Sequence, residues 1–297
     1  MPYISTDDGV RLYYEETGSG DPILFMHEFG GHHRSWEPQL RHFSQRYRCI
    51  AYAARGWPPS DVPDEVAAYS QARAADDAAA VLRELRIEKA HLVGLSMGAT
   101  AALEFGIRHP TLALSLTAAA CGTGASTDPE QKRKFHDDCV AFADRLEREG
   151  IAAMAELYCA GSARMQYRDK DRPGWEEFKR QFAAGSTRGH ALTMRGVQGP
   201  RVAFFERKAE LNAMPAPVLV LAGDEDDSTL ELAIFLKRNI PHCGLLMLPK
   251  TGHTINLEEP GAFNSALENF LNAVERGGWA KRDVVDSHRY LLVPKDK

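Results

Sequence analysis

A five-residue turn constrains the fold of this chain more than any other feature. The sequence Gly-Leu-Ser-Met-Gly at residues 94–98 joins an apolar run, residues 90–95, to a segment rich in small residues, 99–109. In a tight strand-to-helix turn, side chains at the two glycine positions would collide with the sheet, and the strained backbone holds the serine hydroxyl above it. The pattern predicts a strand, a helix and a nucleophilic Ser96 between them. A helix-capping serine is the alternative.

Strand and helix patterns alternate along most of the chain. The strand segments are β-branched, aromatic or aliphatic and are bounded by Gly, Ser, Asp or Pro. Residues 112–120 are nearly continuous in apolar character, as in parallel strands covered on both faces. We expect an α/β fold with a mostly parallel central sheet flanked by helices. Strands are predicted at residues 1–6, 10–16, 23–27, 47–54, 90–95, 112–120, 217–222 and 244–248, and helices at 34–43, 69–86, 96–109, 230–238 and 258–274.

The pattern changes between residues 124 and 214, where charge-rich helical stretches follow one another. We predict an inserted helical cap at 124–214 and an α/β core formed by 1–123 and 215–297. A chain of 297 residues is long enough for one core plus a modest insertion. The large apolar residues of this insertion either line a substrate pocket or form its own core, and the burial preference of apolar side chains favours the core. They are Met154, Tyr158, Met165, Tyr167, Trp175, Phe178, Phe182, Met194, Phe204 and Phe205.

Composition favours a small-molecule partner over nucleic acid or a membrane. The charge balance, 36 Lys plus Arg against 41 Asp plus Glu, is −5, so no basic footprint is present. The amino-terminal residues lack the pattern of a signal peptide, and no apolar run approaches the roughly 20 residues that span a bilayer. The five cysteines are scattered without spacing typical of zinc sites or disulfides. We therefore expect a cytoplasmic protein.

A serine nucleophile needs a base within hydrogen-bond reach and a third group that orients the base. His253 follows the apolar run 245–248 and precedes a helix, so we expect it at the carboxyl end of the sheet, the edge that also carries Ser96. The other histidines lie in helices, turns or the tail, where a solvated or structural imidazole is the more frequent role. An ordinary loop histidine is the alternative for His253.

The acid should follow a strand that lies between the serine and the histidine in sequence. Asp224, Glu225, Asp226 and Asp227 stand directly after the apolar run 218–222. Four adjacent carboxylates cannot all be buried, so most are solvated or cap the next helix. The residues alone leave open which one orients the histidine.

Four motifs give the chain a resemblance to the α/β-hydrolase superfamily across residues 3–275. They are Phe-Met-His-Glu-Phe-Gly-Gly at 25–31, the turn at 94–98, Gly-x-x-Asp at 223–226 and Gly-His at 252–253. The resemblance implies that Asp226, the last residue of Gly-x-x-Asp, is the triad acid. It also implies that the backbone amides of Met97 and Phe29 form an oxyanion hole.

The chain departs from this family at Glu28. Relatives usually have His-Gly where this sequence has His27-Glu28. The glutamate would alter the turn that aims the Phe29 amide, or bring a carboxylate near the catalytic histidine or the substrate. A solvent-facing loop carboxylate is the alternative. Zinc is rejected because three residues, not two, separate Glu28 from His32, and two of them are glycines that break the helix of His-Glu-x-x-His. No metal and no cofactor are predicted.

A serine at the nucleophile turn excludes two classes that resemble this fold, haloalkane dehalogenases and epoxide hydrolases, which place an aspartate there. We predict a serine hydrolase in which Ser96 attacks an ester-like carbonyl and His253 activates the water that hydrolyses the acyl-enzyme. Carbon–carbon bond hydrolases, lactonases and amidases share these residues, and a non-catalytic small-ligand receptor is a further alternative. The choice among them lies in the cap.

Overall fold

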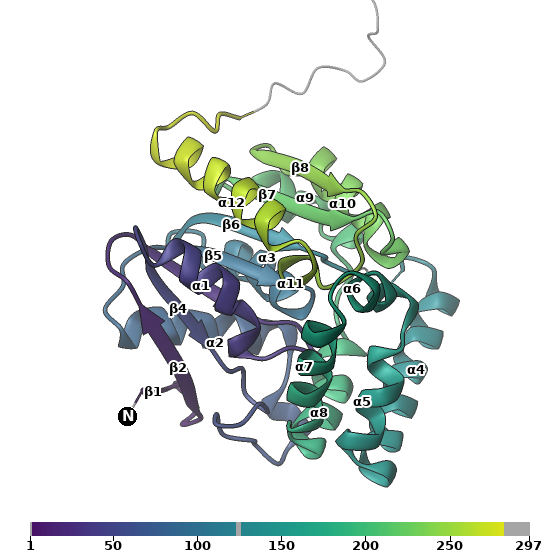
Figure 1. The fold of residues 1–297 in the computed structure, drawn as a ribbon. Helices are drawn as coiled ribbons and strands as arrows, with labels where there is room; N and C mark the ends of the chain where they lie inside the picture. The colour runs from purple at the N-terminus through teal and green to yellow at the C-terminus, as the bar shows by residue number, and fades with distance from the viewer. Residues whose placement is uncertain (1, 123–125, 282–297) are drawn as a thin grey trace, which may run out of the picture.

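The computed structural model describes residues 2–122 and 126–281, and within them an eight-stranded sheet forms the centre of the molecule (Figure 1). The strand order is β1-β2-β4-β3-β5-β6-β7-β8. β1 and β2 run antiparallel to their neighbours, and all pairs from β4 to β8 are parallel. The predicted α/β class with a mostly parallel sheet is confirmed. The strands are β1 Tyr3–Ser5, β2 Arg11–Thr17, β3 Pro22–Met26, β4 Arg48–Tyr52, β5 Ala90–Leu95, β6 Ala113–Ala119, β7 Val218–Gly223 and β8 Cys243–Leu248.

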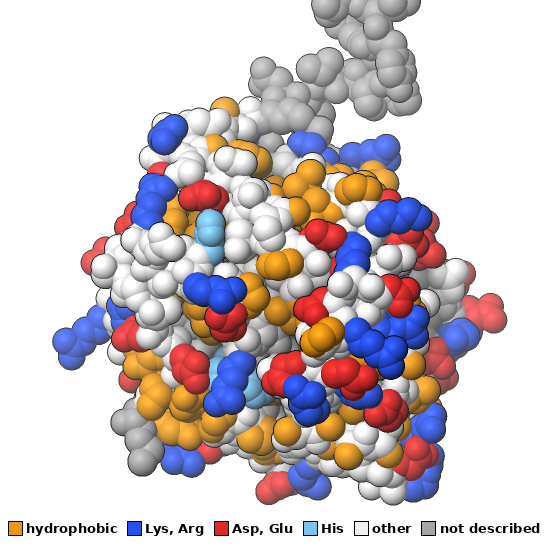
Figure 2. Space-filling view, viewed as in Figure 1, with side chains coloured by type: hydrophobic (Ala, Val, Ile, Leu, Met, Phe, Trp, Pro, Cys, Tyr) orange, Lys and Arg blue, Asp and Glu red, His pale blue; other side chains and the backbone are white. Residues whose placement is uncertain are grey.

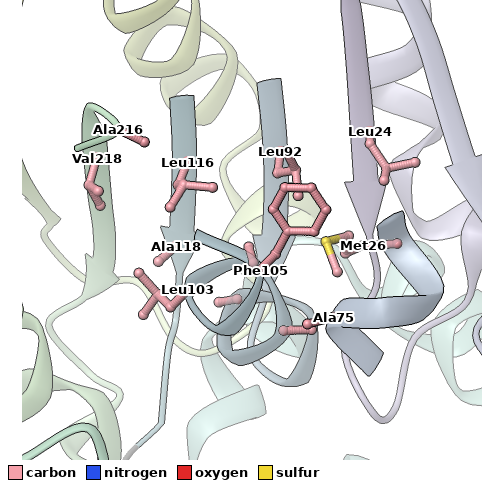
Figure 3. Packing of buried hydrophobic residues seen from close by; sticks show 14 of the residues in the cluster. Leu24, Met26, Ala75, Leu92, Leu103, Phe105, Leu116, Ala118, Ala216 and Val218 are labelled. Carbon is pink, nitrogen blue, oxygen red and sulfur yellow. The ribbon is translucent and has the colours of Figure 1, made fainter. Parts of the chain in front are cut away.

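Helices cover both faces of the sheet because its strands are apolar on both sides. Leu24 and Leu92 belong to the cluster that α2, α3 and α10 cover, whereas their neighbours Phe25 and Val93 belong to the cluster beneath α1 and α12. Figure 3 shows Phe105 of α3 packed against the first of these clusters. This two-residue alternation fixes which face each helix covers. The bounds are α1 Glu37–Phe43, α2 Gln71–Glu84, α3 Met97–Arg108, α10 Asp227–Asn239, α11 Ile255–Glu258 and α12 Pro260–Glu275.

A second set of helices, here called the helical insertion, lies between β6 and β7 in sequence. Its helices α4 to α8 pack together beside the sheet, whereas α9 packs against α10 (Figure 1). Phe29 and Met97, which follow β3 and β5, share an apolar cluster with Ile151 and Phe182 of the insertion. The insertion therefore covers the carboxyl ends of the central strands. The predicted boundary at 123–124 lies outside the described residues, and a separate cap domain stays a prediction. The helices are α4 Pro129–Glu149, α5 Ile151–Cys159, α6 Met165–Lys170, α7 Arg172–Ala183, α8 Thr187–Thr193 and α9 Lys208–Ala213.

Most of the large apolar residues of the insertion are buried, five of them in clusters with other insertion residues and Phe204 in the cluster that α2, α3 and α10 cover. Tyr158 and Met194 instead line the pocket described below. The core preference follows from one-sided helices, as in α7, whose large apolar residues all lie on the buried face. Those buried are Met154, Tyr167, Trp175, Phe178, Phe182 and Phe204.

Acidic and basic side chains are intermingled on the face of the molecule drawn in Figure 2. Many are paired, for example Lys179 with Glu156 and Glu176 on the insertion. Among the helices that the structure describes, none combines the length and apolar character needed to span a membrane. Cytoplasmic location and a small-molecule partner stay predictions, and the tail beyond residue 281 lies outside the described residues.

Candidate active site

Ser96 occupies a strained turn between β5 and α3. Its φ of 54° and ψ of −109° lie in a region that L-residues rarely adopt, and its amide donates a 2.8 Å hydrogen bond to the Ala119 carbonyl. A β-carbon at Gly94 would lie 2.2 Å from the Gly98 carbonyl oxygen, and one at Gly98 would lie 2.0 Å from the Met26 carbonyl oxygen. Both glycines are therefore required by the close approach of neighbouring backbone.

His253 and Asp226 form a buried pair on the loops after β8 and β7. Nδ1 of His253 lies 2.6 Å from Oδ2 of Asp226, and Ser228 donates a 2.9 Å hydrogen bond to Oδ1 of the same carboxylate. Burial raises the pKa of Asp226, but the hydrogen bond and charge of His253 outweigh it, so the pKa lies below its ordinary value. Because an ionised carboxylate only accepts, Nδ1 of His253 is the donor in this contact, and in the neutral imidazole Nε2 is then the acceptor.

The other carboxylates of the cluster lie in solvent. Asp224, Glu225 and Asp227 are exposed, whereas Asp226 is 1% exposed. Asp224 accepts a long hydrogen bond of 3.3 Å from the Thr251 amide. The loop after β7 thus presents one carboxylate to His253 and turns the rest outward.

Ser96 and His253 line one pocket of about 510 Å³ between the sheet edge and the helical insertion. Phe29 and Ser228 complete the side formed by the sheet and its loops. The remaining described residues come from the segment after β6 and from the insertion: Gly122, Ser126, Gln131, Phe135, Cys139, Tyr158, Met194, Gln198 and Arg201. The volume suits a small molecule.

The amides of Phe29 and Met97 follow the carboxyl ends of the adjacent parallel strands β3 and β5, which pair Met26 with Gly94. Neither amide has a hydrogen-bond acceptor in the part of the chain that the structure describes. Since buried N–H groups are almost always paired, two unpaired amides beside a nucleophile suit an oxyanion. These donors are the ones that the family resemblance implies.

Glu28 is buried, so the interpretation of this residue as a solvent-facing carboxylate is wrong. Its side chain is 1% exposed, and Oε2 forms an ion pair with Arg164 of the insertion. The same oxygen lies 3.9 Å from Nε2 of His253. Arg164 also donates a 2.8 Å hydrogen bond to the Tyr158 hydroxyl and stacks over that ring at 4.2 Å. A charged pair thus joins the core to the insertion beside the candidate base.

The loop that carries His253 is held from two sides. The His253 amide donates a 2.7 Å hydrogen bond to the Ala163 carbonyl of the insertion. The Gly252 amide donates to both oxygens of Glu258 in α11, at 2.9 and 3.0 Å, and Lys170 of α6 pairs with the same carboxylate. A β-carbon at Gly252 would lie 2.3 Å from the Ala163 oxygen, which explains the glycine before the histidine.

Sequence reasoning missed Arg164, Glu258 and Arg201. Of these three, only Arg164 could have been anticipated from the sequence, because Glu28 requires a cationic partner if it is buried. The chain has many arginines, and the partner of Glu28 lies 136 residues away in sequence. Nothing local selects it.

Residues 23–266 match the model of the alpha/beta hydrolase family. The chain belongs to this family. The mostly parallel sheet and its flanking helices agree with solved alpha/beta hydrolases.

Alpha/beta hydrolases of several activities resemble the chain. It is 36% identical to epoxide hydrolase 1 of Caenorhabditis elegans, over 89% of this chain and 68% of that protein. It is 27% identical to 3-oxoadipate enol-lactonase 2 of Acinetobacter baylyi, over 89% of this chain and 94% of the relative. A solved thermophilic esterase from Thermogutta terrifontis shares 26% identity with a TM-score of 0.79, covering 92% of this chain and 98% of that chain. These relatives support a hydrolase.

Proposed function

We propose that the protein is a serine hydrolase that cleaves an ester-like carbonyl of a small molecule through an acyl-enzyme. One observation carries the proposal: the 2.6 Å contact between His253 and Asp226, which leaves Nε2 of His253 at the pocket that Ser96 lines. A nucleophile, a base and an acid that fixes the tautomer of the base are the groups that acyl transfer needs.

The mechanism follows from these groups. Ser96 Oγ attacks the carbonyl carbon while Nε2 of His253 takes its proton, and Asp226 stabilises the imidazolium. The amides of Phe29 and Met97 receive the oxyanion. The intermediate collapses as His253 returns the proton to the leaving group, which leaves an acyl ester on Ser96. Water, deprotonated by His253, then attacks this ester, and the acid and free Ser96 are released.

The serine argues against epoxide hydrolysis despite the similarity to an epoxide hydrolase. An aspartate that opens an epoxide forms an ester, which water hydrolyses at its carbonyl. A serine that opened an epoxide would form an ether, which has no carbonyl for water to attack, so the enzyme would stop after one turnover. A lactone is a cyclic ester and passes through the same steps, so lactonase activity, favoured by the enol-lactonase relative, is the second candidate.

Covalent labelling tests the proposal directly. An organophosphonate probe should add once per chain, at Ser96, and Ser96→Ala should abolish both labelling and turnover of a p-nitrophenyl ester panel. Ser19→Ala, which changes an exposed serine between β2 and β3 that does not line the pocket, should leave both unchanged. Intact mass and peptide mapping measure the label. Labelling of another serine, or full activity in Ser96→Ala, would contradict the proposal; labelling without turnover of any ester would favour a receptor.

A further inference from the structure

One arginine lines the candidate active-site pocket without an acidic partner in the part of the chain that the structure describes. Arg201 follows α8 in sequence, at the end of the insertion. Its Nη1 donates a hydrogen bond of 3.5 Å to Thr100 Oγ1 and its Nε one of 3.4 Å to the Gln198 carbonyl, both at the long limit. The Phe135 ring lies 5.8 Å from the guanidinium. Two long bonds to neutral oxygens leave most of its five N–H donors for another partner.

No Asp or Glu of the described residues forms an ion pair with Arg201, although the group is poorly solvated. Burial lowers the pKa of Arg201 from its ordinary value, and no carboxylate acts against this effect. The arginine also borders an outer hollow that contains Glu206, but Glu206 pairs with Lys132 instead. A guanidinium does not lose its proton in proteins, so the site holds a positive charge that no acidic side chain within residues 2–122 and 126–281 compensates.

The position of this charge relative to the nucleophile follows from α3. Thr100, which meets Arg201, also donates a 3.2 Å hydrogen bond to the Ser96 carbonyl. Residues four apart on a helix are separated by roughly 6 Å along its axis. Arg201 and Ser96 thus reach the same pocket about one helical turn apart. An anion bound by Arg201 would lie a few carbon atoms from a carbonyl attacked by Ser96.

We propose that Arg201 binds a carboxylate of the substrate, so that the natural substrate is an ester or lactone with a free carboxylate a few carbons from the scissile carbonyl. This inference rests on the proposed serine hydrolase function. A guanidinium matches a carboxylate with two parallel hydrogen bonds. Among the described residues that line the pocket, Arg201 is the only Lys or Arg, so it balances a monoanion; a phosphate dianion would keep one charge unpaired.

Matched pairs of esters test the inference by kinetics. Monoethyl glutarate and monoethyl adipate carry the carboxylate on the acyl side, and ethyl pentanoate and ethyl hexanoate are their neutral counterparts. 3-Carboxypropyl butyrate places the carboxylate on the leaving group, with butyl butyrate as its control. We expect at least one anionic ester to have a higher kcat/KM than its counterpart. Arg201→Gln should lower that value by about tenfold to a hundredfold, the usual strength of hydrogen bonds to charged groups, and spare the neutral esters.

Two further variants separate binding from general effects of charge and folding. Arg133→Gln removes the same charge from an exposed site on α4 that does not line the pocket, and should leave the preference unchanged. Arg201→Lys keeps the charge but loses the paired donors, so it should fall between wild type and Arg201→Gln. An equal loss in Arg133→Gln would indicate long-range attraction, which weakens with salt, and would overturn the assignment to Arg201.

A binding measurement that needs no turnover distinguishes this inference from the proposed function. At least one of the three anionic esters should raise the Tm of Ser96→Ala, which cannot hydrolyse it, and the additional Arg201→Gln change should remove the shift. If neutral esters are hydrolysed but no anionic ester is preferred, and none of the three shifts the Tm, the inference is wrong and the serine hydrolase stands. If an anionic ester binds through Arg201 but Ser96 is neither labelled nor required for turnover, the hydrolase is wrong and the carboxylate site stands.

Discussion

Two arginines of the helical insertion lie near the candidate active site, and they differ in their partners: Arg201 lines the pocket, whereas Arg164 is buried beside Glu28. Arg164 pairs with the buried carboxylate of Glu28 and stacks on Tyr158. Arg201 reaches only neutral oxygens at 3.4 and 3.5 Å. Removing one partner of a buried ion pair leaves an uncompensated charge, whereas removing an unpaired charge relieves a cost. Arg164 therefore stabilises the contact between the core and the insertion, whereas Arg201 is available to a ligand.

The same contrast distinguishes the two sides of the pocket. Around the candidate base, Asp226 pairs with His253 and Glu28 pairs with Arg164. Charges that are matched before a substrate arrives are preorganised for the reaction and need little rearrangement. The side with Arg201 is preorganised for a ligand instead, because its charge lacks a partner in the described chain.

The largest expected effect is on kcat, and it concerns Asp226, the carboxylate that pairs with His253. Asp226→Asn should lower kcat by up to roughly ten-thousandfold, because the amide no longer fixes the tautomer of His253 or stabilises the imidazolium. Asp224→Asn, two residues away but exposed, should keep near-normal turnover. Turnover and Tm of both variants provide the measurement. A large loss of turnover in Asp224→Asn with normal turnover in Asp226→Asn would show that Asp224, and not Asp226, is the acid.

The comparison of the two arginines predicts opposite effects on stability. Arg164→Met should lower the free energy of unfolding by about 3–5 kcal/mol, because it leaves Glu28 buried without a partner. Arg201→Met should be neutral or stabilising. Adding Glu28→Gln to Arg164→Met should recover part of the loss, with a coupling of about 0.5–3 kcal/mol. Urea unfolding of wild type, the two methionine variants, Glu28→Gln alone and the double variant measures these values, and equal destabilisation by both methionine substitutions would remove the distinction.

The smallest effect concerns pH and His27, which supports the same loop as Glu28. Its Nε2 accepts from the Ala54 amide at 3.0 Å, and its Nδ1 donates to the Glu28 carbonyl at 2.8 Å. Burial lowers the pKa of His27 to about 3, below the 6.5 of an unfolded chain. The unfolded state therefore binds the proton first, and the stability from neutral His27 is present above pH 6.5 and lost as the pH falls toward 3.

His27→Asn tests this pH effect. In the variant, the fall of the free energy of unfolding between about pH 6.5 and pH 5 should be shallower than in wild type, by up to about 1.4 kcal/mol per pH unit. His33 and His190, buried with lowered pKa values of about 3 and 4, remain in both chains and contribute equally. Urea unfolding across this range measures the slope, and identical slopes would show that His27 is not the source.

Local patterns predicted the fold well because strands and turns depend on neighbouring residues. The apolar run at 90–95 is β5 without change, and the glycines of the turn at 94–98 are required by close contacts. Sheet order was less accessible: β2 and β3 are consecutive in sequence, but β4 lies between them. Nothing in either strand's sequence indicates that neighbour, because the order depends on how the whole sheet assembles.

The candidate site was predictable where it follows strand ends and not where the insertion contributes. Asp226 and His253 come directly after β7 and β8, so parallel topology brings them to one edge. Their catalytic roles stay proposals. Arg201 meets Thr100 across 101 residues of sequence, and that contact depends on how the insertion packs on the sheet. No spacing rule encodes such a contact.

The hydrogen bond from the His253 amide to the Ala163 carbonyl limits how this family member can be redesigned. A chimera that exchanged the helical insertion for one from a relative would also replace the backbone acceptor on which the histidine loop rests. We expect such a chimera to displace His253, the candidate base, unless residues 162–164 are retained. The same contact bears on substrate entry: lifting the insertion away at this point would break the hydrogen bond to the His253 amide, whereas a route between α4 and the Arg201 segment would leave it intact.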